Sequence, residues 1–144
     1  MTAVLAEPTR AETWLYTQLS SDPTISGIVG TRIFADVAPQ EVTDYPMIVL
    51  KYLSAQPDLY GNGPTVIWSR MTYIVVGLTE GRSAKALQTL ADRIGTVLHT
   101  GRGGVTGAEV DYCVRRRPFR LTTVENNRTF QQLGYEFEIA VRAL

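Results

Sequence analysis

One stretch of the sequence, residues 65–98, constrains the fold more than any other because it joins a long strand pattern to an amphipathic helix. Residues 65–79 read TVIWSRMTYIVVGLT, and residues 71–78 are apolar at nearly every position, which predicts a strand covered on both faces. Gly81 interrupts this pattern, and Ser83 is a suitable N-cap for a helix that follows. Apolar residues recur along one side of that helix: Ala84, Leu87, Leu90, Ala91, Ile94, Val97 and Leu98. We expect the helix to pack on the strand before it.

The length and charge of the chain limit the classes of protein to consider. The 144 residues fit one domain, residues 1–144, with a single core. Fourteen basic residues balance fourteen acidic ones, so no net field attracts the protein to nucleic acid or to a membrane. The single cysteine, Cys113, excludes an internal disulfide. We see no signal peptide and no apolar run of the ~20 residues that a membrane span needs, and we expect synthesis in the cytoplasm.

The N-terminal part of the sequence predicts two helices and a short strand. Thr9 and Glu12 form a capping-box pattern after Pro8, which predicts a helix that begins there and ends near Ser20. Asp22 then precedes a short helical turn over residues 23–29. Residues 32–37 suit a short strand, and residues 39–45 are polar enough to form a loop.

Two connections flank the central strand and its helix. Residues 47–53, MIVLKYL, predict a strand, and residues 54–64, SAQPDLYGNGP, predict a long loop into the next strand. Such a loop either binds a partner or is merely flexible, and both interpretations stay open. If it binds, the candidate contact residues are Gln56, Asp58, Tyr60 and Asn62. Residues 100–107, TGRGGVTG, predict a second flexible connection after the helix.

The last third of the sequence predicts a hairpin between residues 110–118 and 133–141, with a two-residue turn at Asn126 and Asn127. Pairing about this turn sets opposite charges side by side: Asp111 with Arg142, Arg115 with Glu138, Arg117 with Glu136, and Glu125 with Arg128. The other face pairs Tyr112 with Val141, Val114 with Ile139, and Arg116 with Phe137. Pro118 lacks an N–H and therefore predicts an edge strand. These patterns together predict an α+β domain with an antiparallel or mixed sheet of four to five strands and two main helices packed on it.

The sequence contains no pattern that predicts catalysis, a metal site or a cofactor site. His99 is the only histidine, and its place in the last helical turn favours a capping role over a nucleophilic relay. One cysteine and one histidine are too few for a zinc site. The glycines of residues 101–107 follow a helix rather than a strand, which excludes a dinucleotide fingerprint. Glu136 and Glu138 lie two apart, and the predicted hairpin gives them arginine partners instead of acid–base roles.

The basic run at residues 115–120, RRRPFR, is the remaining candidate site. Arg115, Arg116, Arg117 and Arg120 could contact phosphate groups, but the balanced net charge favours ion pairs within or between subunits. We therefore take these four arginines as candidate assembly-interface residues.

Three segments resemble the tail terminator, or tail-completion, family of long-tailed, siphovirus-like bacteriophages. They are AETWLYTQLSSDPTISGIVGTRIF, the strand YPMIVLKYL, and the helix ALQTLADRIGTVL after a long strand, and the resemblance spans residues 9–141. It implies a non-enzymatic virion protein that forms a ring, hexameric in the family, on the head-proximal end of the tail tube. The ring would stop tube polymerisation and join the tail to the neck. The implied partners are further copies of the chain, the tail tube protein and a head–tail connector, and DNA would pass through the lumen without sequence-specific binding.

Two other functions stay open at this point. One is a different head–tail connector, which would form a ring on the portal side, and the other is a small enzyme or host-directed phage protein whose site is assembled from scattered residues. Affinity for the capsid connector alone would indicate the first, and turnover of a small molecule would indicate the second.

Overall fold

A computed structural model describes residues 3–36, 44–60, 66–105 and 107–143, with side chains for residues 10–36, 44–54, 69–105 and 107–142. The helices are α1 (Ala3–Ser20), α2 (Pro23–Val29) and α3 (Gln88–Leu98), and a 3-10 turn, η1 (Ala84–Leu87), leads into α3. The strands are β1 (Ile33–Ala35), β2 (Met47–Tyr60), β3 (Val66–Glu80), β4 (Gly101–Val105), β5 (Ala108–Glu125) and β6 (Arg128–Ala143).

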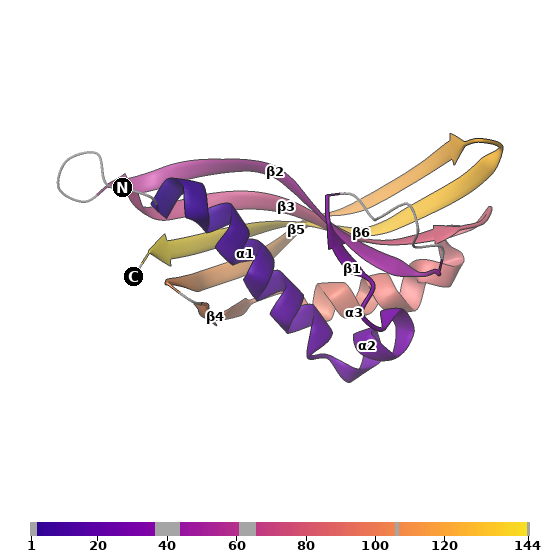
Figure 1. The fold of residues 1–144 in the computed structure, drawn as a ribbon, viewed down its shortest axis with the longest axis horizontal. Coiled ribbons are helices and arrows are strands. Elements are labelled where there is room, and N and C mark those ends of the chain that lie inside the picture. Colours follow the sequence, from indigo (N-terminus) through magenta and orange to yellow (C-terminus); the bar gives the residue numbers. More distant parts are fainter. Residues whose placement is uncertain (1–2, 37–43, 61–65, 106, 144) are drawn as a thin grey trace.

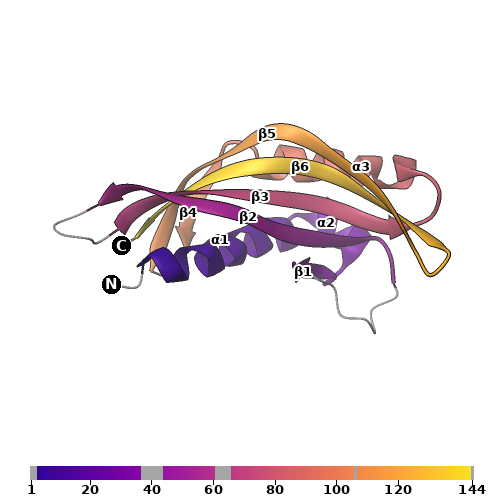
Figure 2. The same ribbon diagram turned by 90° about the horizontal axis from the view of Figure 1, so that it is seen from above.

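The strands form one curled sheet in the order β1-β2-β3-β6-β5-β4 (Figures 1 and 2). β1 runs parallel to β2, and the other neighbours are antiparallel, so the sheet is mixed. The expected α+β class and mixed sheet are confirmed. The expected strand count is wrong, because the described residues form six strands instead of four to five. The third described helix, besides the two main ones, is the short helix predicted over residues 23–29.

The main core lies between the helices and one face of the sheet (Figure 1). The apolar side of η1 and α3 is buried there as predicted, and Trp14, Leu15 and Leu19 of α1 meet it. β3 contributes Tyr73 and Val75, and a Cβ added at Gly77 would lie 2.8 Å from Leu90. The helix therefore packs on the preceding strand, as expected, and on its neighbour β6 as well.

The opposite face of the sheet carries a second, smaller apolar cluster. Val49, Ile74 and Val76 are buried there, with Leu78 and Phe119 packed against them. The ammonium of Lys51 lies 5.3 Å from the centre of the Phe119 ring and donates a hydrogen bond to Gln132. Burial lowers the pKa of Lys51. This cluster explains why the central strand is apolar on both faces although the described helices cover only one.

Helix α1 begins before the predicted start. Its backbone is helical from Ala3 to Ser20, so Thr9 lies inside the helix and the predicted capping box is wrong. Alanine and leucine in the segment upstream are strong helix formers, and they extend the helix past Pro8. The predicted end near Ser20 is confirmed.

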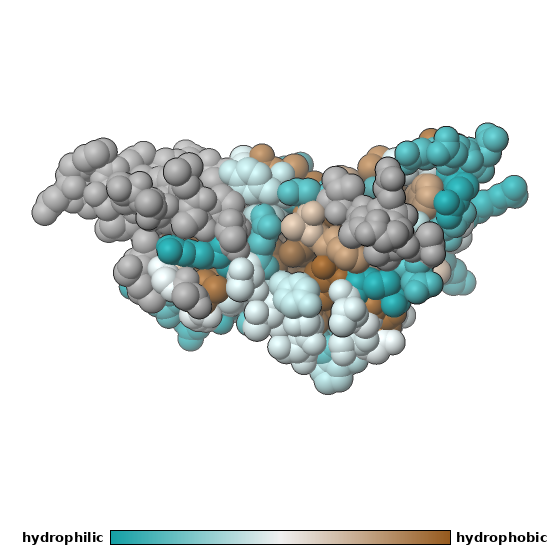
Figure 3. All heavy atoms as spheres, in the orientation of Figure 1, coloured by the Kyte–Doolittle hydropathy of each residue, from teal (hydrophilic) through white to brown (hydrophobic). Residues whose placement is uncertain are grey.

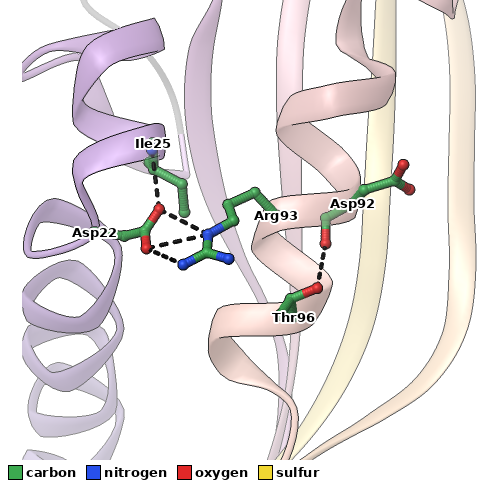
Figure 4. Close-up of polar contacts among 5 residues, drawn as sticks. All are labelled: Asp22, Ile25, Asp92, Arg93 and Thr96. Atoms are coloured by element: carbon green, nitrogen blue, oxygen red, sulfur yellow. Dashed lines mark hydrogen bonds and ion pairs between the residues drawn. The ribbon is translucent and has the colours of Figure 1, made fainter.

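The predicted short helix α2 is confirmed and is tied to α3 by a buried carboxylate. Asp22 is the N-cap, and its Oδ2 accepts a hydrogen bond from the backbone N–H of Ile25 at 3.1 Å. The Arg93 guanidinium donates to both oxygens of Asp22, from Nε at 3.1 and 3.0 Å and from one terminal nitrogen at 2.6 Å (Figure 4). The hydrogen bonds from Arg93 lower the pKa of the Asp22 carboxyl, against the opposing effect of burial.

The predicted loop over residues 54–64 is wrong for most of its length. β2 continues through Tyr60, and residues 54–60 pair with β3, for example Gln56 with Arg70 and Pro57 with Ser69. Proline is tolerated at position 57 because this part of β2 has a described neighbour on one side only, β3. On the other side, β1 pairs only with residues 48–50 of β2. Irregularities in the ladder on both sides of Pro57 absorb the mismatch. Asn62 lies outside the described residues, as does most of the predicted loop over residues 39–45.

The second predicted connection, residues 100–107, is also wrong, because residues 101–105 form strand β4 on the edge beside β5. Its glycines hide the strand pattern, since glycine has low strand propensity. Gly101 is required by packing: an added Cβ would lie 2.9 Å from the Trp14 ring and 3.1 Å from the Leu98 carbonyl oxygen. Glycine in this strand therefore reflects close approach to the helices.

The predicted hairpin is confirmed, and its predicted register holds from the turn as far as Arg117 and Glu136. Asn126 and Asn127 have φ values of 52° and 62°, as a two-residue turn of this kind requires. Two irregularities, between Arg115 and Arg117 and between Val110 and Tyr112, then shift the pairing. The resulting pairs are Arg115 with Phe137, Val114 with Glu138, Tyr112 with Ala140, Val110 with Val141, and Glu109 with Arg142.

The shift makes four predicted pairs wrong: Arg115 with Glu138, Tyr112 with Val141, Val114 with Ile139, and Arg116 with Phe137. The predicted pairing of Glu125 with Arg128 lies outside the shift and is confirmed. Arg115 does not face Glu138, which instead accepts a hydrogen bond from the Tyr112 hydroxyl at 2.6 Å. Glu125 faces Arg128 in the ladder, but the Arg128 guanidinium bonds to Glu80. Arg142 faces Glu109 and still forms an ion pair with Asp111 at 3.4 Å. Pairing residues outward from the turn cannot predict these bulges, because each bulge depends on the residues that pack against the strand.

We expect the Arg117–Glu136 pair to contribute little to stability. The Arg117 side chain is 74% exposed, and exposed ion pairs contribute about 0.2–1 kcal/mol. A double-mutant cycle with Arg117→Ala and Glu136→Ala, measured by urea unfolding, should give a coupling energy in this range. The same cycle on Arg115 and Glu138 should give none, and a sizeable coupling there would contradict the bulged register.

Candidate assembly surfaces

The four arginines of the basic run differ in their surroundings. The Arg117 Nε lies 3.0 Å from Glu136 Oε2, so this residue is paired within the chain. The Arg115 guanidinium lies over the Tyr135 ring at 4.9 Å from its centre. Arg116 and Arg120 are exposed, and neither side chain has a hydrogen bond or ion pair to another described residue. The predicted set therefore contains two arginines with partners and two whose side chains have none among the described residues.

His99 fixes the strand at the point where the bulge begins. It follows α3 as the C-cap residue, and its Nδ1 accepts a hydrogen bond from the backbone N–H of Arg115 at 3.1 Å. The next residue, Thr100, donates its N–H to the Cys113 carbonyl at 2.7 Å. The histidine thus holds β5 against the end of the helix, and the bulge leaves Arg116 without a partner in the described ladder.

The free edge of the sheet follows from the strand lengths. β4 pairs only with the first part of β5, up to Cys113, so among the described residues Val114 to Glu125 have a neighbour on one side only. The prediction of an edge strand at Pro118 is confirmed. Since proline and charged side chains oppose pairing with another strand, this edge favours contacts made through side chains.

The turn end of the β5–β6 hairpin extends beyond the helices (Figure 1). Leu121 and Val124 are exposed on this part of the hairpin. Arg128, directly after the turn, donates two hydrogen bonds to Glu80 at the end of β3, at 2.8 and 2.6 Å, and the bonds to Glu80 raise the pKa of Arg128. The turn end of the hairpin is therefore tied to the end of β3.

The candidate residues on β2 cannot be placed as side chains. The backbone of Gln56, Asp58 and Tyr60 lies in β2, on the outer strand beyond β1, and their side chains lie outside what the structure describes. Asn62 lies outside the described residues altogether. The structure does not bring these residues together with the arginines of β5, which lie on the other side of β3 and β6.

The described side chains do not form a recognisable chemical site. No group of three or more His, Cys, Asp or Glu residues is placed to hold a metal in the part of the chain that was searched. Cys113 is buried, and burial raises its pKa to about 12, so the thiol is held neutral and unreactive. None of the described helices is long and apolar enough to cross a membrane.

Comparisons with known proteins identify a family and a solved structure with the same fold. Residues 13–133 match the family model described as "Tail completion protein gp17". The chain belongs to this tail completion family. A comparison with curated protein sequences gives no match. Among solved structures, a chain of the "Virion of native gene transfer agent (GTA) particle" has the same fold, with a TM-score of 0.66 and 13% identity. The match covers 88% of this chain and 91% of that chain.

Membership of the tail completion family makes this protein a structural protein of the virion tail. The resemblance drawn from the sequence is thus confirmed at the level of the family. The signal lay in the order of elements rather than in any single motif, which is why the fold and the family agree although the predicted loops were wrong.

Proposed function

We propose that this protein ends growth of the tail tube by forming a closed ring on its head-proximal end, and that the ring also joins the tail to the neck. The observation that carries the proposal is the match of residues 13–133 to the tail completion family. Identical subunits close into a ring only through heterologous contacts, in which one patch meets a different patch on the next copy. The two edges of this sheet differ in length, charge and shape, which suits such a contact.

The mechanism is steric and requires no turnover. The bound ring covers the surface on which the next ring of tube protein would stack, and it presents a different surface to the head–tail connector. DNA passes through the ring without sequence-specific contacts. Because the contacts are partly polar, we expect the ring to be most stable where the tube holds several copies close together.

Deletion of the gene tests this function directly. The expected result is filled heads without attached tails, together with tails of uncontrolled length, as seen by electron microscopy of lysates. Expression of the protein from a plasmid should restore joined tails of normal length. Normal, joined tails in the deletion strain would reject the proposed function, whereas tails of normal length that fail to join heads would indicate a neck connector instead.

A further inference from the structure

An open groove of about 320 Å³ lies between α1 and β1. Glu12, Thr13 and Tyr16 of α1 line one side, and Ile33, Phe34 and Ala35 of β1 with Leu50 of β2 line the other. Figure 3 shows hydrophobic surface in this region, between α1 and the short strand. The groove lies at the β1 end of the sheet, where the strand order begins.

One carboxylate, Glu12, and one exposed aromatic ring, Tyr16, line the groove. A second carboxylate, Asp36, follows the lining residue Ala35, and a second exposed ring, Tyr52, packs on Tyr73, the hydrogen-bond partner of Glu12. The Glu12 carboxylate accepts a hydrogen bond from the Tyr73 hydroxyl at 2.6 Å, and a carboxylate has acceptor positions left after one such bond. Asp36 directly follows Ala35 and is exposed. The backbone N–H of Asp36 donates to the carbonyl of Leu50, a lining residue of the groove, at 2.7 Å. Burial raises the pKa of the Tyr73 phenol, and the hydrogen bond and charge of Glu12 and the charge of Asp36 raise it further.

The aromatic rings add a second feature suited to a cation. Tyr16 is 43% exposed and lines the groove, and Tyr52 is 39% exposed with its ring 5.6 Å from that of Tyr73. Apolar walls, two carboxylates and tyrosine rings together match an arginine side chain, whose stem is apolar and whose planar guanidinium both pairs with carboxylates and stacks on rings.

Arg116 and Arg120, whose side chains have no partner among the described residues, lie at the far end of the rows of paired residues that begin at the groove. Register pairing continues from Ala35 through Leu50, Val75 and Tyr135 to Pro118, and from Ile33 through Ile48, Gly77 and Leu133 to Arg120. Arg116 and Arg120 therefore occupy one edge at the level of the groove on the other. In a ring of copies that all face the same way, these two edges meet at one level.

We propose that the groove formed by Glu12, Tyr16, Ile33, Phe34, Ala35 and Leu50, with Asp36 at its rim, receives Arg116 and Arg120 of a second copy of this chain. This inference rests on the ring proposed above and assigns its subunit contact. Pro118 between the two arginines prevents a continuous strand ladder, so the contact is made by side chains.

Charge exchange between two variants tests the contact. Variant A carries Arg116→Glu and Arg120→Glu, and variant B carries Asp36→Lys. Self-association is measured by sedimentation velocity and native mass spectrometry of each variant, of their equimolar mixture and of the wild type, at protein concentrations up to about 1 mM. We expect each variant alone to associate at least about tenfold more weakly than the wild type, since like charges then face each other. The mixture should recover association in alternating copies, because both of its contacts are complementary.

Two controls separate charge from folding. Arg82→Glu with Arg102→Glu matches variant A, and Asp92→Lys matches variant B; all three positions are exposed. The controls should associate like the wild type, and all variants should keep its melting temperature. Because weak contacts can escape sedimentation, the Asp36→Cys/Arg116→Cys chain should also give an oxidised ladder of covalent oligomers, which neither single variant gives.

Other outcomes overturn the inference. If A and B associate as strongly as the wild type, or if their mixture shows no recovery of association, the groove does not bind these arginines. A ring formed through other contacts remains compatible with that result. A monomeric wild type with no oxidised ladder would reject the contact as well. If Asp36→Lys leaves the ring intact but prevents its attachment to tubes, the groove receives the tube protein instead. Failure of the ring itself is measured separately, by the deletion phenotype.

Discussion

Replacing Gly134 by alanine is expected to destabilise the fold by about 3 kcal/mol or more, because no space exists for a methyl group at this position. An added Cβ would lie 2.0 Å from the Val75 carbonyl oxygen and 2.7 Å from the Val76 Cα. Both atoms belong to the backbone of β3, so no side chain can rotate away to relieve the overlap. Gly134 lies in β6, inside the curled sheet and between β3 and β5 (Figure 2). Urea and thermal unfolding measure the loss.

Gly104→Ala is the matched control for this substitution. Gly104 also lies in a strand, and an added Cβ there meets no atom within 4 Å. Alanine at such a site changes stability by less than about 1 kcal/mol, with a stabilising contribution from the smaller entropy of the unfolded chain. Equal melting temperatures for the two variants would show that the sheet can open at Gly134, contrary to the packing described here.

The second large effect is expected at Asp22, where one carboxylate caps α2 and holds α3. Asp22→Ala removes the hydrogen bond to the Ile25 N–H and all the bonds from Arg93, and we expect a loss of about 2–3 kcal/mol. Asp92→Ala is a control on the residue next to Arg93, since the Asp92 side chain points away from this cluster (Figure 4). Denaturant unfolding should show a loss at Asp22 and almost none at Asp92.

The contribution of Asp22 should also depend on pH. Its pKa is lower in the folded protein than in the unfolded chain, so the ionised carboxylate stabilises the fold at pH values above its ordinary pKa of about 4. This stabilisation is lost as the pH falls through the lower pKa of the folded state. The difference in unfolding free energy between wild type and Asp22→Ala should therefore be largest near pH 7 and shrink below pH ~4. A difference that stays constant down to pH ~2 would contradict this role of the charge.

Local patterns in the sequence determined the elements whose signals are contained in a few neighbouring residues. The buried central strand, the apolar side of α3, the Asp22 cap and the Asn126–Asn127 turn were all predicted, because periodicity, capping and positive φ are local properties. The family also followed from the order of these elements. Even the hairpin register was correct near the turn, where chain connectivity fixes it.

Only the tertiary structure decided the remaining features. Glycines and a proline hid β4 and the second half of β2, because their use in these strands depends on how closely a helix or a neighbouring strand approaches. The bulge at Arg116 depends on His99, a residue of another element, and it leaves Arg116 without a partner in the described ladder. The groove depends on α1 lying beside β1, and its alignment with Arg116 and Arg120 depends on a register carried across the sheet. Contacts between residues distant in the chain set these features, and no local pattern encodes them.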